Sequence, residues 1–126
     1  ALLAFRNGLV EIGMLDEVVS FTMSDFGRTL NSNGNGSDHG WGGVQLVMGG
    51  AVANGGPLRG RQVWGDYPLL ELDGEQTTGR GRLIPTTSVQ QFGATLAHWL
   101  GVADTQLDAI FPNLGEFATR RLDFLS

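Results

Sequence analysis

The order of the apolar segments predicts an α/β fold in which helices cover a mostly parallel sheet. A helix-like pattern opens the chain, two strand-like runs flank a glycine-rich loop, and an amphipathic segment follows near the end. Helices and strands in this order are typical of α/β domains, where functional residues lie in loops beyond the carboxyl ends of the strands.

The first predicted element is an N-terminal helix. Its apolar residues recur at the spacing of one helix face: Leu2, Phe5, Leu9 and Ile12. Gly13 follows at once, at a position where glycine commonly ends a helix. We therefore expect a helix that begins at the start of the chain and ends near Ile12.

Two strands and an irregular stretch are predicted next. Residues 17–23 (EVVSFTM) are β-branched and aromatic, as buried strands are, and residues 44–52 (VQLVMGGAV) form a second apolar run. Residues 54–78 are expected to be irregular, with a short hairpin around 58–64.

A capped helix is predicted after this stretch. Ser88 is a natural N-cap, Gln91 completes a capping box and Gly101 ends the element. A last short helix is expected over residues 104–110, because Pro112 stops it.

Composition excludes several classes of protein. The net charge is −5 and all eight basic residues are scattered arginines, which argues against a nucleic-acid surface. With no cysteine, disulfides, thiolate metal sites and cysteine nucleophiles are absent. No apolar run is long enough to predict a transmembrane segment. The chain does not begin with Met and opens inside an apolar pattern, so we expect a fragment of a larger protein.

Charged residues on both sides of the glycine-rich loop point to a site. Asp25 follows the predicted strand 17–23, where it could bind a cation, although an Asx turn would explain it equally well. Arg28 could hold a phosphate or sulfate oxygen, and an ion pair with Asp25 is the structural alternative. Asp38 and His39 lie beyond the loop. A histidine there can ligate a metal or donate to an oxyanion, or it can simply be an exposed turn residue.

Several segments together resemble a known family. FTMSDFGRT, NGNGSDHGWGG, IPTTSVQQFGATLAHWLGV and FPNLGEFATR are similar to the C-terminal part of the bacterial proteins called domain of unknown function 1501. That family is itself similar to the alkaline phosphatase and sulfatase superfamily. The resemblance implies that residues 1–126 are a single fragment, the C-terminal portion of a larger alkaline-phosphatase-like layered domain. It also implies a periplasmic or extracytoplasmic location, since members commonly carry a twin-arginine export signal.

The resemblance extends to individual site residues, with two departures. In TMSDFG, Asp25 matches the superfamily's metal-binding aspartate, but Phe26 stands where a second ligand is usual. In DHGWGG, His39 and Gly40 match a His-Gly motif, but Gly43 replaces its lysine.

The function implied is metal-dependent hydrolysis of phosphate or sulfate esters. Asp25, His39 and Asp38 are the candidate ligands of a zinc, manganese, calcium or magnesium ion, and His39 and Arg28 the candidate catalytic residues. The substrate would be a small anionic ester, and the nucleophile would lie upstream in the same protein. The alternative is a non-catalytic exported module that binds a glycan or a partner protein, which Phe26 and Gly43 favour.

Overall fold

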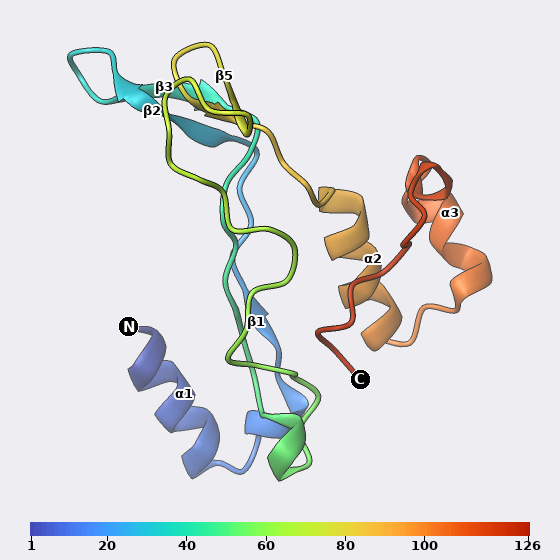
Figure 1. The fold of residues 1–126 in the computed structure, drawn as a ribbon. Coiled ribbons are helices and arrows are strands. Elements are labelled where there is room, and N and C mark those ends of the chain that lie inside the picture. Colours follow the sequence, from blue (N-terminus) through green and yellow to red (C-terminus); the bar gives the residue numbers. More distant parts are fainter. The chain divides into compact units, whose positions relative to one another are not determined.

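The computed structural model describes all residues 1–126, with three α-helices and six short strands (Figure 1). The chain divides into two compact units. We call the first the helical unit; it comprises Ala1–Phe21, Val47–Trp64 and Ser88–Ser126. The second, the hairpin unit, comprises Thr22–Leu46 and Gly65–Thr87.

The helical unit contains all three helices: α1 (Leu2–Glu11), α2 (Val89–Trp99) and α3 (Leu107–Ile110). The predicted capping box is present at α2, where the Ser88 hydroxyl accepts from the backbone N–H of Gln90 (3.1 Å) and Gln91 Oε1 accepts from that of Ser88 (2.9 Å). These bonds satisfy donors that the first helical turn leaves unpaired. No helix combines the length and apolar character needed to span a membrane.

Two buried clusters form the core of the helical unit, and α2 contributes to both. The first consists of Leu58, Leu96 and Phe124, and the second of Ala94, Leu107 and Leu114. Phe92, on α2, is partly buried and packs against the first cluster. Its ring lies 5.6 Å from that of Phe124 and 5.9 Å from that of Phe21 (centroid distances).

The predicted mostly parallel sheet, and with it the alkaline-phosphatase-like layered fold, is wrong for this chain. The strands form three two-stranded sheets, all antiparallel. They pair β1 (Ser20–Phe21) with β4 (Val47–Met48), β2 (Gly27–Ser32) with β3 (Ser37–Gly40), and β5 (Thr77–Thr78) with β6 (Arg82–Leu83). The protein is a small mixed α/β structure.

The connection between the two apolar runs explains the antiparallel pairing. A parallel pair needs a crossover, usually a helix, between its strands. The chain between β1 and β4 holds the β2–β3 hairpin and no helix. Each run also contributes only two residues of strand. The hairpin expected near 58–64 is likewise absent, because Leu58 makes only isolated bridges, to Ala51 and Leu125.

The hairpin unit is built around β2. On one edge β2 pairs with β3, and the register places Gly27 opposite Gly40 and Arg28 opposite His39. On its other edge, the turn between β5 and β6 lies against it, because the Leu30 N–H donates to the carbonyl of Gly81 (3.0 Å). These contacts fix where the charged side chains of β2 and β3 lie.

Candidate functional site

The β2–β3 hairpin gathers three of the four predicted site residues, and the fourth lies two residues before it. Arg28 and His39 are direct cross-strand neighbours, and Asp38 precedes His39 on β3. Asp25 lies in the bend that leads into β2. Side chains directly opposite in an antiparallel pair are close enough to act together.

Phe26 organises the exposed side of this hairpin. Its ring stacks on the imidazole of His39, with 3.6 Å between the ring centroids and 13° between the planes. The guanidinium carbon of Arg28 lies 5.1 Å from the centroid of the same ring, within reach of a cation–π interaction. Arg28 Nη1 also donates to the carbonyl of Ser37 (2.7 Å). Phe26 therefore fixes both side chains that could contact an anion, a role that sequence reasoning missed.

Asp38 is held in an internal network. Its carboxylate accepts from Asn33 Nδ2 (2.8 Å) and pairs with Arg80 Nε (3.0 Å), while its backbone N–H donates to Thr29 Oγ1 (3.0 Å). The hydrogen bond from Asn33, helped by the charges of Arg80 and Arg82, lowers the pKa of Asp38 below its usual value. Asp38 is thus an ionised carboxylate whose oxygens already have partners.

Asp25, in contrast, has an exposed carboxylate with no hydrogen bond or ion pair. Neither structural alternative for this residue is present, since its side chain caps no turn and Arg28 contacts Ser37 and Phe26 instead. Asp25 is adjacent in sequence to Phe26, whose ring lies on His39. It is the carboxylate at this end of the hairpin that is available to a ligand.

The predicted residues do not form a metal centre on their own. Nowhere in the chain do three or more His, Cys, Asp or Glu side chains come together in a way that could hold a metal ion. Catalytic metal sites commonly use three protein ligands. Asp38 is paired with Arg80, so Asp25 and His39 could supply at most two.

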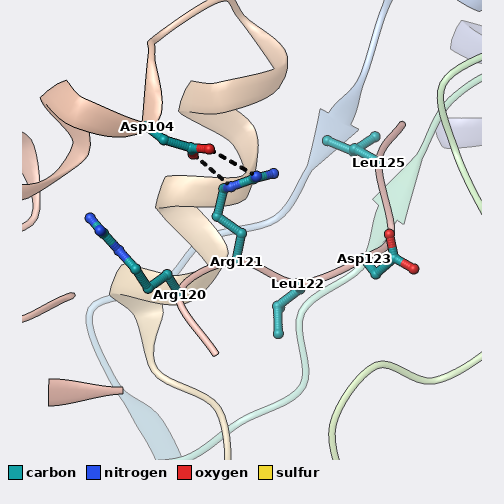
Figure 2. Close-up of a pocket in the computed structure, with 6 residues that line it drawn as sticks. All are labelled: Asp104, Arg120, Arg121, Leu122, Asp123 and Leu125. Atoms are coloured by element: carbon teal, nitrogen blue, oxygen red, sulfur yellow. Dashed lines mark hydrogen bonds and ion pairs between the residues drawn. The ribbon is translucent and has the colours of Figure 1, made fainter. Parts of the chain in front are cut away.

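A pocket in the helical unit is the second place where charged residues gather (Figure 2). It has a volume of about 400 Å³ and six lining residues: Asp104, Arg120, Arg121, Leu122, Asp123 and Leu125. Figure 2 shows the guanidinium of Arg121 facing Asp104, with Nε 3.0 Å from Oδ1. Arg120 pairs with Asp108 (2.7 Å), and Asp123 pairs with Arg59. Every charge has a partner, which indicates a structural role.

Comparison with known proteins identifies one relationship. A family model described as "Protein of unknown function (DUF1501)" matches residues 1–113. This range contains the whole hairpin unit and all three helices. No curated protein and no solved structure matches the chain.

Proposed function

Because the chain belongs to the DUF1501 family, and because its motifs resemble those of alkaline phosphatases and sulfatases, we propose that it is the C-terminal part of a phosphate- or sulfate-ester hydrolase. We place the nucleophile outside residues 1–126 and the protein in the periplasm or another extracytoplasmic compartment. One observation carries this assignment. The hairpin sets Arg28 opposite His39, and Phe26 holds both side chains.

Arg28 and His39 would hold the anionic group of the ester. Arg28 uses Nη1 on the Ser37 carbonyl, which leaves its other donors free for an oxyanion. The imidazole of His39 stacks on Phe26 and its ring nitrogens make no hydrogen bond within the chain, so a protonated imidazole can donate to the leaving or transferring oxygen. Donors fixed in advance at a developing charge stabilise the transition state without reorganisation.

A zinc, manganese, calcium or magnesium ion is the cofactor that the superfamily resemblance implies. Such an ion, when bound, stabilises negative charge on the oxygens of the ester. The residues of this chain do not complete a site for it. Asp25 has the unengaged carboxylate of the predicted set, so it is the residue whose loss should affect a bound cation most.

A non-catalytic binding module is the second candidate. Phe26 stands where the alkaline phosphatase and sulfatase superfamily usually has a metal-binding residue, and its ring stacks on the imidazole of His39. Trp41, two residues beyond His39, is 68% exposed and offers a flat apolar surface of the kind that stacks on sugar rings. These features favour a glycan as the ligand of such a module.

Hydrolysis by the full-length protein distinguishes the two candidates. The substrates are p-nitrophenyl phosphate and p-nitrophenyl sulfate, each supplied with zinc, manganese, calcium or magnesium. If the hydrolase assignment is right, Arg28→Gln and His39→Gln lower kcat/KM by roughly 10²–10³-fold, as losing one transition-state donor does. Asp66→Asn, an exposed aspartate of the same unit, should leave it unchanged.

Metal content is measured on the same proteins. We expect Asp25→Asn to lower the bound metal and Asp66→Asn to leave it unchanged. Absence of turnover with every metal and both esters would contradict the hydrolase assignment. Glycan binding that is lost in Trp41→Ala would then support the binding module.

A further inference from the structure

Two arginines adopt a backbone conformation that arginine rarely takes. Arg61 has φ 63° and Arg80 has φ 66°, and they are the non-glycine residues of the chain with positive φ. In this region the Cβ atom of an L-residue crowds its own backbone, so glycine and, to a lesser extent, asparagine are favoured there. Strained residues of this kind persist where the surroundings or a function require them.

Contacts within the chain account for Arg80. Its Nε pairs with Asp38 (3.0 Å) and its Nη2 donates to the carbonyl of Ser32 (3.1 Å). Its own carbonyl accepts from the backbone N–H of Asn31 (3.2 Å). The left-handed conformation of Arg80 therefore places its side chain where it joins the β5–β6 turn to the β2–β3 hairpin.

No contact within the chain accounts for Arg61. Each of the other seven arginines makes at least one side-chain hydrogen bond or ion pair: Arg6, Arg28, Arg59, Arg80, Arg82, Arg120 and Arg121. Arg61 makes none, although its neighbour Arg59 pairs with Asp123. The guanidinium of Arg61 is exposed and unengaged, so it is free to bind a partner outside the chain.

Arg61 lines a pocket that suits such a partner. The pocket is an open hollow of about 560 Å³ on the surface. It is lined by residues 51–54, which include the 3₁₀ turn Val52–Asn54, and by residues 58–62. Ligand sites commonly have volumes of about 300–1,000 Å³. The pocket contains no carboxylate, although the chain as a whole carries a net charge of −5. Leu58 supplies a buried apolar wall, and the unengaged amide of Asn54 supplies a neutral donor.

We propose that this pocket, the Arg61 pocket, binds a small ligand through a carboxylate, phosphate or sulfate group. Arg61 provides the charged contact, since a guanidinium matches the paired oxygens of these groups. Asn54 provides a second hydrogen bond, and Leu58 packs against the apolar part of the ligand. The pocket lies entirely in the helical unit, whereas the proposed ester site lies in the hairpin unit.

Isothermal titration calorimetry on the full-length protein tests the Arg61 pocket. The probes are inorganic phosphate, inorganic sulfate and succinate, which separate the three oxyanion chemistries. All titrations use an Arg28→Gln background, so that binding at the proposed ester site does not contribute. Arg61→Asn removes the charge and keeps a residue that tolerates positive φ. Arg6→Gln, on exposed α1, is the matched control for loss of one arginine.

At least one probe should bind, and Arg61→Asn should weaken its binding about tenfold or more, the effect of losing a charged hydrogen bond. Arg61→Gly should weaken binding equally while leaving the melting temperature unchanged or higher, because glycine relieves the strain. Arg6→Gln should bind like the background. Equal binding by Arg61→Asn and the background, or no binding of any probe, would overturn the proposal.

Discussion

Gly27 is the first residue of β2 and lies between Phe26 and Arg28. The segment that follows β3 passes close to it at Gly42. A Cβ atom on Gly27 would stand 1.7 Å from the carbonyl oxygen of Gly42 and 2.6 Å from its carbon. Real Cβ contacts essentially never fall under 3.0 Å, so the oxygen would have to retreat by about 1.3 Å. Both sides are held, because Gly27 pairs with Gly40 and the Gly42 N–H donates to the Leu83 carbonyl (3.1 Å).

Gly27→Ala should therefore destabilise the hairpin by about 1–3 kcal/mol, the usual cost of forcing extra atoms into a packed site. Amide hydrogen exchange in residues 22–46 of the full-length protein, followed by mass spectrometry, should become roughly fivefold to 150-fold faster. Gly43→Ala is the matched control. Its Cβ would meet its nearest neighbour at 3.7 Å, so exchange should change little. Equal exchange in the two variants would refute the close packing on which the site geometry depends.

Three further changes test other parts of the structure. Ser88→Ala should lower the free energy of unfolding of the helical unit by about 1 kcal/mol, measured by urea denaturation, because it removes the capping box. Leu107→Ala should lower it by about 2–5 kcal/mol, since this side chain is 0% exposed, whereas Leu100→Ala, at a position 75% exposed, should change it little. Asn33→Ala should raise the pKa of Asp38 in an NMR titration, because Asn33 is the main stabiliser of the ionised form. In the unaltered protein, the stabilisation by ionised Asp38 is present above its unfolded pKa and is lost as the pH falls through its lowered folded pKa.

Local signals in the sequence were sufficient to predict the helices. The capping box at Ser88 and Gln91 forms from residues three apart, and Gly101 takes the left-handed conformation (φ 98°) expected after the helix. Gly13 does the same after α1 (φ 72°). Such signals are read from neighbouring residues, so no knowledge of the rest of the fold is required.

The sheet could not be predicted in the same way. An apolar run such as residues 17–23 indicates a strand, but its composition does not say which strand it pairs with or in which direction. In the structure, only Ser20–Phe21 of that run is strand, and its partner is Val47–Met48, some 26 residues later. The antiparallel direction of this pair follows from the β2–β3 hairpin that connects its strands. The glycine-rich sequence of that segment indicates a loop and gives no sign of a hairpin.

The candidate site was partly predictable. The sequence singled out Arg28 and His39, and the hairpin register does bring these two together. It gave no sign that Asp38 would form an ion pair with Arg80. The two residues are 42 positions apart in the sequence, and the contact depends on the left-handed backbone conformation of Arg80. From the sequence alone, Phe26 stands only as a residue that cannot ligate a metal, because its stacking on His39 depends on the register of two strands.

The most direct measurement of the central claim is a crystal structure of the full-length protein with bound phosphate. We expect the phosphate oxygens to lie about 2.7–3.2 Å from a guanidinium nitrogen of Arg28 and from a ring nitrogen of His39. The carboxylate of Asp25 should face the same space. A phosphate bound elsewhere, with the side chains of Asp25 and His39 directed away from each other, would contradict the assignment of the β2–β3 hairpin as the anion-binding part of an ester hydrolase.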